Sequence, residues 1–157
     1  MARRTPTRSA GLLLFRRLDD GIEVLIAHPG GPLWARKDVG AWSLPKGLYD
    51  SDEQPEAAAR REFTEELGTP PPDGPAVELG EVTLASGKVV TGFAIEGDLD
   101  TDTVASNTFE MQWPPRSGRM QAFPEIDRAQ WVDPATARAK LNPAQAAFVD
   151  RLLDSLR

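Results

Sequence analysis

The apolar positions of this chain fall in short runs, which is typical of β-strands. Two pairs of runs flank turn sequences, Leu18-Asp19-Asp20-Gly21 and Ser86-Gly87, and so predict two β-hairpins. The strands that the runs predict are residues 10–17, 22–28, 77–84 and 88–95, with shorter ones at 42–44, 108–113 and 129–132. Between them, we expect loops at 29–41, 96–107 and 114–127.

A helix is predicted from Pro55 to Leu67. Ala59, Phe63 and Leu67 recur every four residues and form an apolar stripe, which should pack on the sheet. Pro55 suits the first turn, because it lacks the N–H that would be unpaired there. Gly68 suits the left-handed residue that closes a helix.

Two further helices are predicted near the end of the chain. Asp133-Pro134 and Asn142-Pro143 each place an N-cap residue before a proline. The second helix offers apolar side chains for burial, namely Ala146, Ala147, Val149, Leu152 and Leu153. Helices and strands together predict a single mixed α/β domain over residues 1–157, with residues 1–9 as a flexible tail.

Composition narrows the functional classes. The net charge is −6, which argues against non-specific nucleic-acid binding, because such binding relies on clustered lysine and arginine. The absence of cysteine excludes disulfides and thiolate chemistry. The apolar run 11–15 is too short for a signal peptide, and no run is long enough to span a membrane. We therefore expect a cytoplasmic protein without nucleic-acid or membrane partners.

The predicted helix carries a crowd of carboxylates. Glu62, Glu65 and Glu66 project to one side of it, and Glu53 lies just ahead. Like charges at this spacing destabilise a helix. One interpretation is a solvated acidic face. The other is a cation site, since Mg²⁺ binds carboxylate oxygens together with substrate phosphates; Arg61 could then hold Glu53 through a bidentate ion pair.

The segment ahead of the helix suits phosphate. Lys46 supplies a positive charge and Gly47 a turn. A protein with a net charge of −6 repels a polyphosphate unless metal ions bridge the two. The combination indicates magnesium-assisted chemistry on a phosphorylated small molecule, in which the metal neutralises phosphate charge and activates water.

The spacing of these residues resembles a known signature. The sequence GLYDSDEQPEAAARREFTEELG, from Gly47 to Gly68, is similar to the Nudix box of the Nudix hydrolases. One position departs: Thr69 stands where the family favours an apolar residue. The resemblance implies an α/β/α sandwich with a mixed central β-sheet. It also implies hydrolysis of a nucleoside diphosphate linked to another group, with Mg²⁺ as cofactor and Mn²⁺ as a substitute.

The same resemblance assigns roles within the box. It implies that the Gly47 carbonyl, Glu62, Glu65 and Glu66 bind the metal. Glu62 and Glu65 also belong to the implied catalytic set, in which Arg61 orients Glu53.

The candidate site residues outside the box rest on weaker sequence patterns. Glu125 stands six residues before Trp131, which resembles diadenosine polyphosphate hydrolases, and it is a candidate catalytic base. Glu110 is a second candidate, and a solvated surface glutamate is the alternative for both. The candidates for substrate binding are Lys46, Lys88, Arg116 and the possible aromatic platform Trp34, with surface charge or core packing as their alternatives.

The expected function is therefore enzymatic. The leading hypothesis is a Mg²⁺-dependent pyrophosphohydrolase that acts on a dinucleoside polyphosphate by water attack on phosphorus. The alternatives are a nucleoside triphosphate or nucleotide-sugar (ADP-ribose) pyrophosphatase, and a non-catalytic nucleotide-sensing module of the same fold. We expect a monomer or homodimer whose partner is a small nucleotide or polyphosphate.

Overall fold

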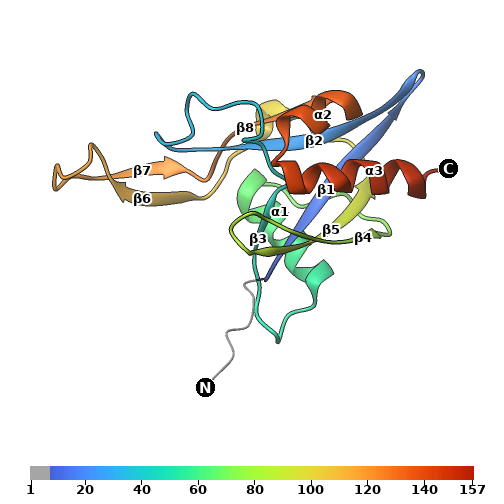
Figure 1. Ribbon diagram of the computed structural model, residues 1–157, viewed down its shortest axis with the longest axis horizontal. Helices are drawn as coiled ribbons and strands as arrows, with labels where there is room; N and C mark the ends of the chain where they lie inside the picture. The colour runs from blue at the N-terminus through green and yellow to red at the C-terminus, as the bar shows by residue number, and fades with distance from the viewer. Residues whose placement is uncertain (1–7) are drawn as a thin grey trace.

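A mixed β-sheet between two layers of helices forms the body of the protein in the computed structural model, which describes residues 8–157 (Figure 1). The strand order is β4-β5-β1-β2-β8, and β3 pairs with β1 off this path. β1 runs parallel to β5 and antiparallel to β2 and β3. The strands are β1 (Arg8–Leu18), β2 (Gly21–Pro29), β3 (Lys46–Leu48), β4 (Val77–Thr83), β5 (Val89–Glu96) and β8 (Ile126–Val132).

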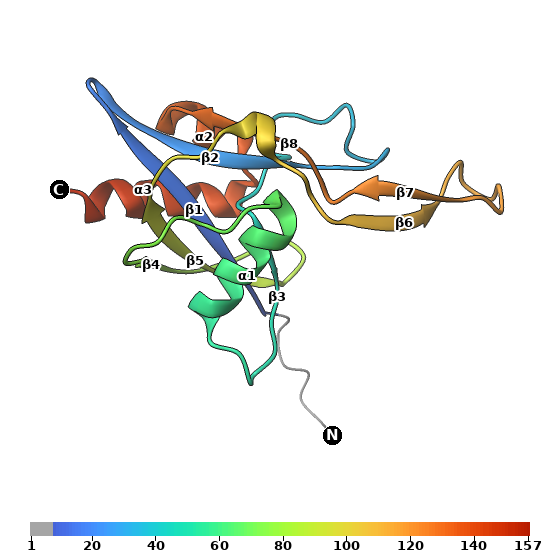
Figure 2. The ribbon, with the colours of Figure 1, turned by 180° about the vertical axis from the view of Figure 1, so that it is seen from behind.

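The two faces of the sheet carry separate apolar cores. In β1, Leu12 and Leu14 face helix α1 (Pro55–Leu67), while Leu13 faces the layer of α2 (Pro134–Lys140) and α3 (Ala146–Ser155). A strand buried on both faces reads as a continuous apolar run, which is why the pattern 11–15 shows no alternation. Figure 2 shows α1 on the face opposite α3. The predicted α/β/α sandwich is confirmed.

Helix α1 has the bounds that its sequence predicts. The predicted stripe of Ala59, Phe63 and Leu67 is fully buried against the sheet. Gly68 has φ 78°, and its N–H donates to the Thr64 carbonyl oxygen at 2.8 Å, which closes the helix.

Several sequence predictions were wrong in detail. Of the predicted strand 42–44, only Trp42 and Ser43 make bridges, both isolated, and the strand in this region is β3. The predicted loop 114–127 contains β7 (Met120–Pro124), which pairs with β6 (Thr108–Gln112) to form a separate two-stranded ribbon. This ribbon extends away from the body (Figure 1). Its strands are held by main-chain pairing and bury little apolar surface, so the apolar pattern gave no sign of β7.

The ends of the chain also differ from expectation. β1 begins at Arg8, so Arg8 and Ser9 belong to the sheet, and the rest of the predicted tail lies outside the described residues. Pro143 begins a short 3₁₀ turn, Pro143–Gln145, and α3 follows it. Another 3₁₀ turn, Thr101–Thr103, lies before β6. Within residues 8–157 no helix is both long and apolar enough to cross a membrane.

We expect Gly68→Ala to destabilise the fold by about 2 kcal/mol. The left-handed φ strains any side chain there, and the new Cβ would also overlap the Ala105 carbonyl oxygen. Gly87→Ala is the matched control, because Gly87 has φ 92° but open space around it. Denaturant unfolding should give a clearly smaller loss for Gly87→Ala; equal losses would contradict the packing component.

Candidate metal and phosphate site

Strand β3 and helix α1 bring the acidic residues of the box onto the backbone of Lys46 and Gly47. The Lys46 N–H donates to Glu66 Oε2 at 3.0 Å. A Cβ at Gly47 would overlap the carboxylate of Glu62. Gly47 is thus required by space, since Glu62 occupies the volume of a side chain at that position.

Arg61 joins three carboxylates of the box. Its Nε and one terminal nitrogen donate to the two oxygens of Glu53, each at 2.8 Å. The other terminal nitrogen donates to Glu62 at 2.8 Å and to both oxygens of Glu65 at 3.3 Å. The sequence prediction that Arg61 holds Glu53 bidentately agrees with this geometry, and the fork also explains how the crowded carboxylates are tolerated.

Burial shapes the charges of the site. Glu62 and Glu66 are each only 9% exposed. Burial raises the pKa of Glu66 to about 8, against the opposing effect of the Lys46 N–H and its ammonium. Burial also raises the pKa of Glu62, which the Arg61 guanidinium opposes. The pKa of Lys46 is lowered, chiefly by burial, although the charge of Glu66 acts the other way.

The donor set fits a hard divalent cation. Carboxylate oxygens gather here without sulfur or imidazole, which suits Mg²⁺ or Mn²⁺. The buried Glu66 carboxylate has a main-chain donor at one oxygen and no arginine or lysine ion pair among the described residues. Between residues 8 and 157, however, no three acidic or histidine side chains are already arranged to hold a metal ion. Arg61 occupies oxygens of Glu53, Glu62 and Glu65. The residues that could hold the cation are Gly47, Glu62, Glu65 and Glu66.

A cavity of about 420 Å³ borders this group of residues. Lys46, Glu66, Lys88, Glu125 and Trp34 all line it, so residues from five separate segments of the chain meet here. Glu125 contributes to the raised pKa of Glu66 by its negative charge, after the larger effect of burial. Its own side chain is exposed.

Other candidates lie elsewhere. Arg116 is in the turn that joins β6 to β7, at the end of the ribbon that lies away from the body (Figure 1), and it does not line the cavity. Glu110 is exposed on β6 and does not line the cavity either.

Sequence reasoning did not predict several polar residues of the cavity, namely Ser43, Ser86, Asn142 and Gln145, and Gln145 is the most informative of them. Gln145 is only 1% exposed and accepts a hydrogen bond from the Leu44 N–H at 2.9 Å. It also bonds the Ser43 hydroxyl, with 3.0 Å between Nε2 and Oγ. Gln145 therefore fixes the backbone just ahead of Lys46. The one sequence signal for its burial is that Gln145 stands between apolar residues at the start of the last helix.

Arg61→Lys is expected to lower kcat/KM for a phosphoanhydride substrate by about 10- to 100-fold. Lysine keeps the charge but cannot hold Glu53, Glu62 and Glu65 through one planar fork. Steady-state hydrolysis assays would measure the loss. Arg60→Lys is the control, since Arg60 bonds Glu56 and the Gly74 carbonyl at the surface. Equal activity in both variants would contradict the positioning role of Arg61.

The fold and this site define the class of protein. The sequence model of the NUDIX domain family matches residues 5–152, so the chain belongs to this family. It is a Nudix hydrolase, an enzyme of the pyrophosphatase type.

Particular relatives and solved structures are similar to it. The RNA pyrophosphohydrolase of Gluconacetobacter diazotrophicus is 31% identical over 137 residues, which are 80% of this chain and 76% of that protein. The NUDIX domain of Shewanella oneidensis NrtR, solved with ADP ribose, has a TM-score of 0.66 at 17% identity, over 99% of this chain and 91% of that one. The C. elegans Ap4A hydrolase has a TM-score of 0.63 at 21% identity, over 98% of this chain and 100% of that one. These two structural likenesses support the fold.

Proposed function

We propose that this protein is a Mg²⁺-dependent pyrophosphohydrolase whose leading substrate is a dinucleoside polyphosphate. The main support is the single cavity that joins two lysines, Lys46 and Lys88, to the carboxylates of Glu66 and Glu125. Ammonium groups attract phosphate, whereas carboxylates repel it. A cavity lined by both lysines and carboxylates suits a reaction in which phosphate, a cation and water meet.

The residues divide the work of cleaving a phosphoanhydride. Lys46 and Lys88 bind phosphate oxygens and stabilise the charge of the leaving phosphate. Glu125 accepts the proton of the attacking water as the new P–O bond forms and the bridging P–O bond breaks. Arg61 and Glu53 orient Glu62 and Glu65, and Glu66 completes the cation ligands. When bound, a divalent cation supplies neutralisation of phosphate charge and Lewis-acid activation.

A second candidate substrate is the 5′-triphosphate end of RNA. The relative from Gluconacetobacter diazotrophicus is named an RNA pyrophosphohydrolase. Such an end presents a nucleoside whose 5′ phosphates are joined by phosphoanhydride bonds, as a dinucleoside polyphosphate does. The net charge of −6 opposes broad contact with the RNA backbone, so we rank this substrate second. Free nucleoside triphosphates and ADP-ribose follow. A nucleotide sensor is the non-catalytic alternative.

The test is a substrate screen with purified protein. Diadenosine tetraphosphate, 5′-triphosphorylated RNA, nucleoside triphosphates and ADP-ribose are incubated with Mg²⁺, and the reaction is repeated with a chelator and then with Mn²⁺. We expect fastest hydrolysis of diadenosine tetraphosphate, loss of activity with the chelator and recovery with Mn²⁺. Cleavage in isotopically labelled water would locate the attacked phosphorus. No hydrolysis of any of these compounds would refute the enzymatic proposal, and faster cleavage of the RNA would favour the second candidate.

Gel filtration of the same preparation tests a separate prediction, that the protein is a monomer or homodimer. The cytoplasmic location likewise stays a prediction.

A further inference from the structure

The buried side chain of His28 has no part in the proposed hydrolysis. His28 is the only histidine of the chain and lies at the end of β2, where it is fully buried. Its Nδ1 is 2.8 Å from a carboxylate oxygen of Asp127 in β8, and its Nε2 is 2.6 Å from the main-chain carbonyl oxygen of Lys37. The ring therefore joins the sheet to the loop that follows β2.

Both partners of the ring are hydrogen-bond acceptors. A carbonyl oxygen and an ionised carboxylate have no proton to donate. A neutral imidazole carries one N–H, so it would turn the lone pair of its other nitrogen toward an oxygen. An imidazolium donates from both nitrogens and satisfies both contacts. The geometry therefore requires two ring protons as long as Asp127 is ionised.

The surroundings favour an ionised Asp127. Its side chain is 32% exposed, and the Nε of Arg128 lies 3.8 Å from the same oxygen that faces the ring. Water and a positive charge both stabilise a carboxylate. The ring and Asp127 together are then neutral, which lowers the cost of burying the charged imidazolium.

Other charged groups approach the ring from three elements without bonding to it. Trp42 packs on the ring edge to face, with 5.0 Å between the two centroids. Arg128 of β8 and Lys140 of α2 lie over the Trp42 indole, and Asp38 of the loop accepts a hydrogen bond from its Nε1 at 2.7 Å. Among the described residues, Asp127 is thus the one charged side chain that is hydrogen bonded to the ring.

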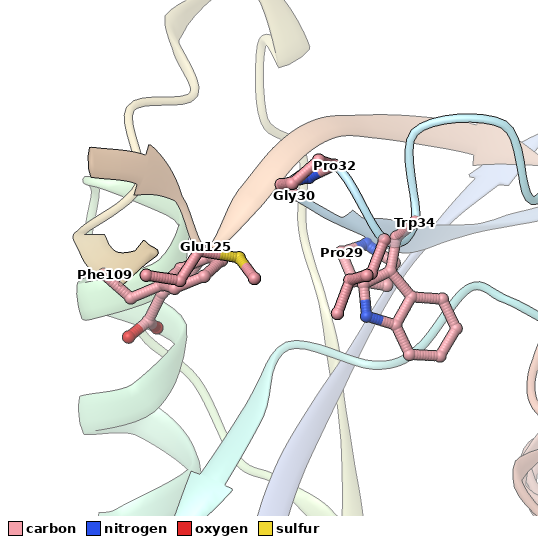
Figure 3. A pocket seen from close by; sticks show the side chains of 9 residues that line it. Pro29, Gly30, Pro32, Trp34, Phe109 and Glu125 are labelled. Atoms are coloured by element: carbon pink, nitrogen blue, oxygen red, sulfur yellow. The ribbon is translucent and has the colours of Figure 1, made fainter. Parts of the chain in front are cut away.

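The bond to Lys37 holds an exposed part of the chain. Residues 33–39 are exposed, and the ammonium of Lys37 lies over the Trp34 ring, 4.9 Å from its centroid. The start of the loop and the Trp34 side chain are shown in Figure 3. Trp34, Gly40 and Ala41 line the cavity of about 420 Å³ that the two lysines also line. A shift of the loop therefore changes one wall of the proposed site.

We infer that His28 is doubly protonated and acts as a clamp through two hydrogen bonds, one to Asp127 and one to the Lys37 carbonyl oxygen. The clamp holds the loop after β2 against β8 and so positions a wall of the substrate cavity. His28 is a positioning residue, since it acts through the loop. The effect on substrate rests on the proposed function, whereas the protonation of the ring does not.

Nitrogen-15 NMR at pH 7 tests the ring directly. In protein prepared without a histidine tag, every imidazole signal comes from His28, because the chain has one histidine. We expect both ring nitrogens to carry a bonded proton and to have the similar shifts of an imidazolium. A single bonded proton, with the widely separated shifts of a neutral imidazole, would overturn the inference.

Asp127→Asn removes the need for the second proton. The asparagine amide can donate to Nδ1 while the Nε2–H still donates to Lys37, so a neutral ring satisfies both contacts. We expect one ring proton, on Nε2, in this variant. Asp154→Asn is the matched control at a side chain that is 69% exposed on α3, and its ring should stay doubly protonated. A doubly protonated ring in Asp127→Asn would contradict the role of Asp127 as the charged partner.

His28→Asn and His28→Gln separate the clamp from packing against Trp42. The asparagine amide reaches Asp127 but is too short to reach Lys37, whereas the glutamine amide can replace Nε2 and keep the bond to the loop. We expect His28→Asn to speed amide hydrogen exchange at Lys37 and Ala41 by about tenfold, since a buried hydrogen bond is lost. It should also raise KM for diadenosine tetraphosphate about fivefold and keep kcat within about twofold, because the loop lies beside the substrate and not at the reacting groups. Both changes should be smaller in His28→Gln.

Each outcome has a clear meaning. Equal changes in His28→Asn and His28→Gln, or faster exchange with an unchanged KM, overturn the positioning role. If both variants fail to fold, the ring protons of wild type and of Asp127→Asn decide the matter. A singly protonated ring in a protein that hydrolyses diadenosine tetraphosphate overturns the clamp and leaves the proposed function standing. A doubly protonated ring and the exchange effect, in a protein that hydrolyses nothing, uphold the clamp and reject the enzymatic proposal.

Discussion

Glu66→Gln is expected to lower the turnover of diadenosine tetraphosphate by about 10³-fold and to leave the fold intact. Glu66 is buried beside Lys46, and a neutral amide removes the negative charge that a cation would meet there. The glutamine oxygen can still accept the hydrogen bond from the Lys46 N–H, so helix α1 keeps its contact with β3. Steady-state kcat at saturating Mg²⁺ and thermal unfolding would measure the two effects.

The matched control is Glu56→Gln in the first turn of the same helix. Glu56 is half-exposed and, among residues 8–157, pairs only with Arg60 at the surface, so we expect kcat within about twofold of wild type, since surface pairs contribute little. Near-normal turnover in Glu66→Gln would remove Glu66 from the proposed cation ligands. Equal losses in both variants would point to a general effect of charge on the helix.

Gly47→Ala should reduce kcat/KM by about 10²-fold. The backbone of Gly47 does not have positive φ, so the effect comes from space alone: the new Cβ would overlap the Glu62 carboxylate and displace it from Arg61. Displacement of a catalytic group by about 1 Å is enough for a loss of this size. Hydrolysis assays under limiting substrate would measure it.

A double variant separates this effect from general damage. In a Glu62→Ala background the obstructing carboxylate is absent, so adding Gly47→Ala should cost little more. The coupling between the two positions is the expected sign of a direct steric contact. Independent, additive losses would contradict the steric account and indicate a different role for Gly47.

Helix α1 shows why part of this protein was predictable from sequence. Its start at Pro55, its end at Gly68 and the buried stripe through Phe63 all depend on neighbours within a few residues. The pairing of Arg61 with Glu53, which lies just ahead of the helix, also joins residues only eight positions apart. Short-range physics therefore predicted both the element and the charged network on it.

The rest of the site depends on contacts that spacing does not reveal. Glu125 and Trp34 are far apart in sequence and meet only because the ribbon folds back on the loop after β2. β7 has too few buried apolar positions to signal a strand. Phe148, which is fully buried beneath Gly92, was missed among the expected core residues of the last helix. Arg116 had the right chemistry for phosphate but lies in the turn of the ribbon.

The central place of β1 has a consequence for how the chain is made. Arg8 pairs with Val89, and Phe15 with Glu96, so the first strand gains its parallel neighbour only after residue 96 has been synthesised. Until then, the nascent β1–β2 hairpin exposes an unpaired edge and two apolar faces, a state that favours association with other chains. Non-local parallel pairing is also slow. We therefore expect the yield of folded protein to depend on temperature and chaperones during synthesis more than the stability of the finished fold would suggest.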